Sequence, residues 1–232
     1  MHRYLIKFNK SGLIRYTSHL DMIRLFHRAF KRIGISLAYS RGFNPHPKMS
    51  FAQPLSLGYI SIGEYLEFET TKPYMTDKVK NDLNDTLPEG IEITECWVLP
   101  ESKKSIASLV TWASYEITCK GKFQPSFDLI ECFLNQDNIV TQKKQKNKKI
   151  KDVDIKPLIR ELKILREKKS EVVIFTMIRA GSDANLNPDF LMSAFSTYAQ
   201  TNYDKIDFEI KRLEIFDSEF QPIQLKVINN IF

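Results

Sequence analysis

The residues with the clearest capacity for binding chemistry lie in one proline-rich stretch, 39–51, which reads YSRGFNPHPKMSF. Its two prolines fix the backbone without supplying amide donors, and its glycine permits a turn, so we predict a shaped loop. An aromatic ring, Phe43, could stack on a base while neighbouring donors hold phosphate. Those donors are Arg41, Asn44, His46 and Lys48. The alternative is that Phe43 fills the core and the prolines only stiffen a connection.

A predicted helix over residues 18–33 precedes this loop. Ser18 is a suitable N-cap, Asp21 can answer it three residues later, and Gly34 follows the last turn. An apolar stripe along one side would face the core. On the polar side, three cations at positions i, i+4 and i+7 share a row: Arg24, Arg28 and Lys31. Because no acid lies four residues from any of them, we interpret the row as open to an anion, with a merely solvated face as the alternative.

Charge is distributed unevenly along the 232 residues, although the formal net charge is only +6. Residues 1–50 contain ten Lys and Arg against one acid, whereas residues 51–100 contain three against nine. Segregation of this kind favours a polyanionic partner, because phosphate contacts provide affinity independent of sequence. A lysine-rich run over 143–151 could add long-range attraction or could be a passive surface loop.

The order of expected elements predicts an α+β protein made of two ferredoxin-like domains, each an antiparallel sheet covered by two helices. We place the domains at 1–100, containing the basic helix and the GFNPHPK loop, and at 101–232, containing the lysine-rich loop. In the first we expect strands at 4–8, 37–39, 64–69 and 91–98, with a second helix at 75–87. In the second we expect strands at 109–119, 172–178 and 208–216, a strand or hairpin at 139–150, helices beginning near 125 and 188, and an extra segment at 156–165. The strand at 64–69 would carry an acidic face.

Several kinds of chemistry have no counterpart in the sequence. The three cysteines fit neither a disulfide framework nor an iron–sulfur motif, and we expect reduced core thiols. No phosphate-binding glycine loop, dinucleotide fingerprint or metal-ligand spacing occurs, so we expect no metal, no cofactor and no catalytic residue. No apolar run reaches the roughly eighteen residues of a membrane span, so we expect no membrane partner and a cytoplasmic location.

Four motifs together carry a resemblance to a known family. They are RYTSHLD at 15–21, YSRGFNPHPKMSFA at 39–52, PLxLG at 54–58 and EYL at 64–66. In these the chain resembles the bacterial radical SAM-associated family, which is built on a domain of unknown function and is usually encoded beside, or fused to, a radical SAM protein. That resemblance implies an accessory role in RNA modification, with tRNA or rRNA and the radical SAM protein as partners. This chain lacks the Cys-x-x-x-Cys-x-x-Cys motif, so the radical chemistry is not its own.

These observations lead to one expectation and two alternatives. We expect an RNA-binding accessory protein without catalytic activity of its own, whose contacts come from the helix row and the loop. The first alternative is a metal-independent endoribonuclease using His46 or His19 as general base. The second is a protein-interaction module that docks the radical SAM partner and does not bind nucleic acid.

Overall fold

The computed structural model describes residues 1–100, 104–120, 123–144, 150–168 and 170–228. The chain divides into two units, the first formed by Met1–Thr111 with Arg212–Phe232 and the second by Trp112–Lys211. The sequence-based boundary lay at residue 100 and placed 212–232 in the second domain. The last segment of the chain thus belongs to the same unit as the first.

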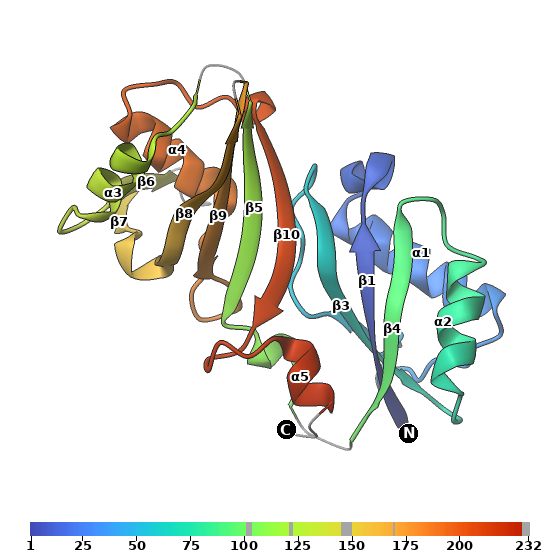
Figure 1. The fold of residues 1–232 in the computed structure, drawn as a ribbon. Helices are drawn as coiled ribbons and strands as arrows, with labels where there is room; N and C mark the ends of the chain where they lie inside the picture. The colour runs from blue at the N-terminus through green and yellow to red at the C-terminus, as the bar shows by residue number, and fades with distance from the viewer. Residues whose placement is uncertain (101–103, 121–122, 145–149, 169, 229–232) are drawn as a thin grey trace. The chain divides into compact units, whose positions relative to one another are not determined.

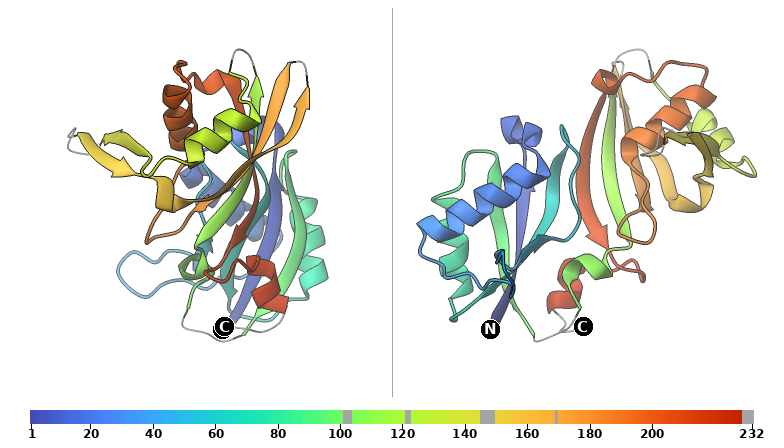
Figure 2. Two further views of the ribbon diagram at one scale, coloured as in Figure 1. Left: turned by 60° about the vertical axis from the view of Figure 1, so that its left-hand side comes forward. Right: turned by 180° about the vertical axis from the view of Figure 1, so that it is seen from behind.

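Unit 1 is an antiparallel sheet with two helices (Figure 1). Its elements are β1 (His2–Lys10), the 3₁₀ helix η1 (Gly12–Tyr16), α1 (His19–Arg32), β2 (Met49–Phe51), β3 (Ile60–Thr70), α2 (Thr76–Asn84), β4 (Ile91–Leu99), η2 (Ile106–Leu109) and α5 (Ile223–Ile228). β1 lies between β4 and β3 and is antiparallel to both, and β2 pairs with the other edge of β3 at Met49↔Phe68. Helices α1 and α2 cover one face of this sheet (Figures 1 and 2).

The core of unit 1 follows from the two periodicities in its sequence. Tyr4, Ile6 and Phe8 alternate along β1 toward the helices, and all three are buried. Met22, Phe26 and further residues of α1 at helical spacing close the other side of this core. The predicted start of α1 is confirmed, because the Asp21 amide donates to Ser18 Oγ at 3.2 Å.

Unit 2 is also α+β. Its elements are β5 (Trp112–Lys120), α3 (Phe127–Leu134), β6 (Val140–Lys144), β7 (Ile150–Asp154), η3 (Lys156–Leu158), β8 (Ile159–Lys168), β9 (Glu171–Arg179), α4 (Pro188–Tyr198), η4 (Lys205–Asp207) and the first part of β10 (Phe208–Phe216). The hydrogen-bonded order is β8-β9-β5-β10, and α3 and α4 lie on one face (Figure 2). The chain is therefore a mixed α+β protein.

The sequence misjudged which part of unit 2 is the insertion. The stretch 139–150 was expected to be a strand or hairpin of the main fold and 156–165 an extra segment. β6 and β7 do form a two-stranded hairpin, but it is separate from the main sheet, and the later segment supplies β8, which pairs with β9. Neither stretch alternates strictly between polar and apolar residues, and 139–150 is mostly polar, so periodicity alone could not assign them.

Three smaller expectations also need comment. Residues 37–39 form only isolated bridges, Leu37↔Thr70 and Tyr39↔Pro47, and no strand. The lysine-rich run falls largely outside the described residues, at 145–149. Of the cysteines, Cys119 is buried and Cys96 half-buried, but Cys132 is exposed, so the expectation of three core thiols was wrong for Cys132.

None of the helices in the described ranges has both the length and the apolar character needed to cross a membrane.

Candidate nucleic-acid interface

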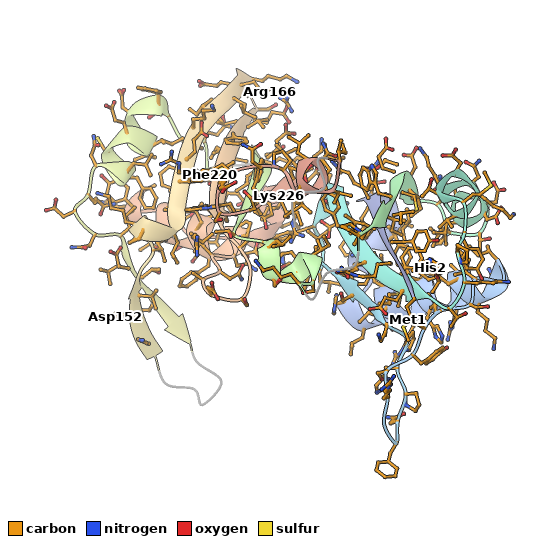
Figure 3. All side chains as sticks on the ribbon, turned by 90° about the horizontal axis from the view of Figure 1, so that it is seen from below. Met1, His2, Asp152, Arg166, Phe220 and Lys226 are labelled. Carbon is orange, nitrogen blue, oxygen red and sulfur yellow. The ribbon has the colours of Figure 1, made fainter. Side chains whose placement is uncertain are left out.

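The proline-rich loop projects from unit 1 near the labelled Met1 (Figure 3). Phe43 has a relative exposure of 112%, so it does not fill the core. Gly42, with φ at 135°, makes the turn beside it, where a side chain would be strained. At the base, the Ser40 amide donates to the His46 carbonyl at 2.8 Å, and the His46 amide donates to Ser40 Oγ at 3.0 Å. The loop is thus a closed projection with an exposed phenyl ring.

The loop donors predicted from sequence divide into two groups. Arg41, Asn44 and His46 are exposed, and none of their side chains has a hydrogen-bond or ion-pair partner in the described part of the chain. Lys48 is different, because its Nζ lies 2.7 Å from Glu69 Oε2 and also contacts the Met1 thioether at 3.6 Å. The charge of Lys48 is compensated, so its predicted role as a free phosphate clamp needs correction.

The acidic face expected on the third strand is not a solvent-exposed face. Glu64 and Glu67 are buried, and each carboxylate of β3 has a cationic partner. The pairs are Glu64 with Arg212, Glu67 with Arg3 and Glu69 with Lys48. These partners are distant in sequence, so the local pattern gave no sign of them.

The row of cations on α1 is only partly open. Arg24 Nη1 lies 3.0 Å from Asp21 Oδ1, one helical turn earlier, so the expectation of a row without an acidic partner was wrong at this position. The Ser18 hydroxyl and then Arg24 hold the pKa of Asp21 below its usual value. Arg28 and Lys31 are exposed, and among the described residues neither side chain has a hydrogen-bond or ion-pair partner. Two of the three predicted helix cations therefore remain available.

The second half of α1 meets the base of the loop. His27 Nε2 lies 3.1 Å from the Tyr39 hydroxyl, and the two rings make an edge contact with centroids 6.4 Å apart. Lys31, His27 and Tyr39 line one pocket of about 470 Å³. The structure therefore joins the end of the cation row to the base of the loop, while Phe43 lies at the far end.

A second hollow, of about 310 Å³, lies beneath the loop. Its lining includes His46 and Lys48 but also the carboxylates of Glu67 and Glu69. Because Lys48 is already paired with Glu69, it offers this hollow no uncompensated positive charge for a phosphate. Any phosphate contact by this loop would therefore use its outer side.

Sequence reasoning missed a buried charge cluster around Glu64, in the first half of β3. Arg212 Nη1 lies 3.0 and 3.2 Å from the two Glu64 oxygens, and Arg212 also donates to the Gln53 and Pro54 carbonyls. Lys10, only 3% exposed, donates to the Thr17 carbonyl at 3.1 Å. Burial lowers the pKa of Lys10 and raises that of Glu64, and the Arg212 charge opposes the second shift.

His19 borders this cluster and is half-buried. Its ring packs edge-on against Phe51 with centroids 5.3 Å apart, and a small cavity beside it is also lined by Lys10 and Glu64. Burial, and then the Lys10 charge, lower the pKa of His19. His46, in contrast, is exposed to solvent. Within the described residues no group of three His, Cys, Asp or Glu side chains is arranged to hold a metal ion.

Comparison with known proteins gives a family and a fold. Residues 3–188 match the model of a family described as "Uncharacterized protein conserved in bacteria (DUF2344)". No curated protein matches the sequence significantly. Among solved structures, a chain in the "Crystal Structure of a Cbf5-Nop10-Gar1 Complex" is similar, with a TM-score of 0.51 and 9% identity. The similarity covers 93% of this chain but 50% of the other, so the present chain spans about half of that relative. At this identity the likeness concerns the fold alone.

Proposed function

The chain belongs to the DUF2344 family, and we propose that it is an RNA-binding accessory protein whose contacts are made by unit 1. The exposed ring of Phe43 would stack on a base. Arg28, Lys31 and Arg41 would contact phosphates, and Asn44 or His46 would reach a base edge or a 2′-hydroxyl. Arg24 and Lys48 would contribute less, because each already has an acidic partner.

The observation that carries the proposal is the complete exposure of Phe43 at the end of a closed, proline-braced loop. An aromatic ring is costly to leave in water, and burial of a phenylalanine side chain is worth about 1.5–3 kcal/mol. Stacking against a base recovers this without sequence specificity, at about 1–3 kcal/mol for each base. The exposed Arg41 of the same loop and the exposed cations of α1 favour a nucleic-acid partner over an apolar one.

The available helix cations support the same assignment. Arg28 and Lys31 follow one another along α1, and Lys31 shares a pocket with the base of the loop. Side chains held by carboxylates release fewer counterions when they meet a phosphate, so unpaired cations are the ones that matter for affinity. Unit 1 supplies such cations on α1 and on the loop.

The fold is compatible with this role. We assign each unit to the ferredoxin-like class, supported in unit 1 by the order β4-β1-β3-β2 and in unit 2 by β10-β5-β9-β8. In both units the elements run strand, helix, strand, strand, helix, strand, with the β6–β7 hairpin inserted in the second. Small sheets of this type commonly place binding residues on loops beside the sheet.

The resemblance to the radical SAM-associated family supplies the finer part of the proposal. The chain would present tRNA or rRNA to a radical SAM enzyme in the cytoplasm, and that enzyme would carry out the modification. A docking role without RNA is the competing assignment. Co-purification of the enzyme that survives nuclease and high salt, with no RNA affinity in the isolated chain, would favour docking.

The test measures RNA affinity against salt concentration for the full chain and a triple variant, Arg28→Ala, Lys31→Ala and Arg41→Ala. Because each phosphate contact on a single strand contributes about 0.7 to the slope of log K against log salt, we expect the slope to fall by about 2. Fluorescence anisotropy with a labelled oligonucleotide provides the measurement.

The matched control replaces three surface lysines that already have carboxylate partners, Lys78, Lys120 and Lys163. It removes the same formal charge, so it separates net charge from specific contacts. Equal losses of RNA affinity and salt slope in the two triple variants would show that binding depends on net charge and not on these particular contacts. An unchanged slope in the first variant would contradict the proposal.

Exposure of His46 favours one second candidate, a metal-independent ribonuclease. Its imidazole lies in the same loop as Arg41, so a base and a cation are near one another in sequence and both are exposed. Incubation of RNA with the protein in EDTA tests this, with His46→Ala as control. Cleavage that the variant lacks would establish the activity.

A further inference from the structure

The pocket of about 470 Å³ beside the second half of α1 has a construction suited to a small ligand. Its floor includes Ile35 and Leu37, each 7% exposed and part of the hydrophobic core. Its rim carries polar groups, among them His27, Lys31 and Ser36. An apolar floor with a few polar groups above it is the usual composition of a small-molecule site, and the volume is within the common range of about 300–1,000 Å³.

The wall formed by residues 34–36 is held in place by Tyr74. The Ser36 amide donates to the Tyr74 hydroxyl at 2.7 Å, and that hydroxyl donates to the Gly34 carbonyl at 3.3 Å. Burial by itself would raise the pKa of Tyr74, but the hydrogen bonds with Ser36 and the nearby Lys72 charge lower it below its ordinary value. The Ser36 carbonyl in turn accepts from the Thr71 amide at 3.0 Å. With both backbone groups of Ser36 bonded, this wall is formed before any ligand arrives.

The opposite wall combines an aromatic face with a hydrogen-bonding pair. Tyr39 is 46% exposed, so part of its ring remains open to a ligand. Its hydroxyl and His27 Nε2, 3.1 Å apart, form a fixed pair able to donate to and accept from a flat heterocycle. An open ring beside such a pair is a suitable surface for stacking and edge recognition of a base.

The charge of the pocket favours an anionic ligand. Lys31 is the charged group of its lining, and no carboxylate is among the described residues that line it. In this it differs from the hollow beneath the loop, which contains two glutamates. The C-terminal end of α1 has the unfavourable dipole sign for an anion, but Lys31 and Arg32 in the last turn offset it.

From these features we infer that this pocket binds a single unstacked nucleotide, with its base against Tyr39 and its phosphate at Lys31. The inference rests on the proposed function, because it makes the pocket the position where one nucleotide of the bound RNA leaves the strand. The shared chemistry is that of a nucleoside 5′-monophosphate. The source is either an RNA chain or a free mononucleotide, and the two are separable by experiment.

The test titrates each of the four nucleoside 5′-monophosphates into the full chain by calorimetry and repeats the titration with two variants. Ser36→Trp fills the pocket, and its backbone hydrogen bonds are kept because the side chain is exposed. We expect at least one mononucleotide to bind, and binding to weaken by about tenfold or more in Ser36→Trp. Lys31→Ala should weaken it by about tenfold, because a charge-assisted contact to phosphate is lost.

Two matched controls accompany these variants. Ser218→Trp places the same indole on an exposed turn of unit 1 away from the pocket, and Lys78→Ala removes a lysine from α2. Both should bind the mononucleotide as the unmodified chain does. Circular dichroism melting checks that Ser36→Trp is folded.

A second arm measures affinity for an RNA oligonucleotide. If RNA supplies the nucleotide, Ser36→Trp lowers the affinity and reduces the salt slope by no more than about 0.7, the single phosphate contact at Lys31, unlike the fall of about 2 expected for the triple charge variant. Mononucleotide binding that Ser36→Trp abolishes, with RNA affinity intact, would assign the pocket to free nucleotides. Failure of every mononucleotide, together with unchanged RNA affinity in Ser36→Trp, would overturn the inference and leave RNA binding standing. Absence of RNA binding in the unmodified chain would refute the proposed function. The mononucleotide titration would still show whether the pocket binds a nucleotide.

Discussion

Unit 1 contains two populations of cations that the sequence does not distinguish. The first lies along β1 and β10, where each member is held by a carboxylate: Arg3 with Glu67 at 2.5 Å, Lys7 with Glu214 at 2.6 Å, and Arg212 with Glu64 at 3.0 Å. The second lies on α1 and the loop, where Arg28, Lys31 and Arg41 are exposed. Both populations contribute equally to a count of positive charge, but only the second is available to a partner.

The difference shows what burial does to a charge. Arg212 and Glu64 have side-chain exposures of 3% and 4%, so removing either partner would leave the other charge buried and uncompensated. Arg28 has bulk water in place of a partner and loses little when it is replaced. The first population supports the fold, and the second is the basis of the proposed RNA contacts.

The largest expected effect comes from breaking the buried pair. Arg212→Ala should lower the free energy of unfolding by about 3–5 kcal/mol, because it leaves the Glu64 carboxylate buried without its partner. Urea denaturation followed by circular dichroism measures this. Arg28→Ala is the matched control and should change the free energy by less than about 0.5 kcal/mol. Equal effects of the two replacements would remove the distinction between the populations.

The next effect concerns the exposed aromatic ring of the loop. Phe43→Ala should weaken RNA binding by about 1–3 kcal/mol, the usual value of one stacked base, and leave the melting temperature unchanged. Anisotropy titration with an oligonucleotide measures the loss. Phe127→Ala, which removes another exposed phenylalanine from unit 2, should leave RNA affinity as it is. If the Phe43 variant binds RNA normally, the ring is not a stacking platform.

A smaller effect is expected when a loop cation that is now paired with a carboxylate is released from it. Glu69→Gln removes the partner of Lys48, whose Nζ is then free to meet a phosphate. We expect the salt slope of RNA binding to rise by about 0.7, the contribution of one additional contact to a single strand. Glu92→Gln, at an exposed position of β4, serves as the control for charge alone. The same rise in both variants would show that only net charge matters.

The smallest effect is a pH dependence at the border of the buried cluster. The pKa of His19 is lowered below its ordinary value of 6.5 by burial and then by Lys10. Below pH 6.5 the unfolded chain therefore binds more protons at this position than the folded chain does. The free energy of unfolding consequently falls as the pH drops from 6.5 toward the lower pKa of the folded state. Glu64, whose pKa is raised, titrates in the opposite sense nearby, so the comparison must be between variants.

Replacing His19 by glutamine isolates its contribution. Unfolding free energies measured between pH 7 and pH 5 should decline less steeply in His19→Gln than in the unmodified chain. His46→Gln, at an exposed position in the loop, should reproduce the unmodified slope. Parallel curves for all three proteins would show that burial does not shift His19.

Features determined by neighbouring residues were predictable from the sequence. The Ser18 cap, the end of α1 before Gly34 and the start of α4 at Pro188 depend on residues close to one another in the chain, and all three are present. The projecting loop also followed from its prolines and glycine. Whether its aromatic ring lies in the core or at the surface was not predicted, because composition does not reveal the exposure of a side chain.

Features determined by distant residues were not predictable. Lys48 and Glu69 are separated by 21 positions and Arg212 and Glu64 by 148, so no local pattern indicates that these charges are paired. The same limit applies to β8 and the β6–β7 hairpin, since alternation indicates a strand but not its partner. The Tyr74 bond that holds the pocket wall joins residues 38 positions apart.

The return of residues 212–232 to unit 1 affects the order in which the protein can fold during synthesis. While a ribosome is translating unit 2, the nascent first unit holds the Glu64 carboxylate with no Arg212 yet made to neutralise it. Unit 2 therefore has all of its own sequence available before unit 1 does, although its synthesis begins later. The first unit to start is thus the last that can be completed.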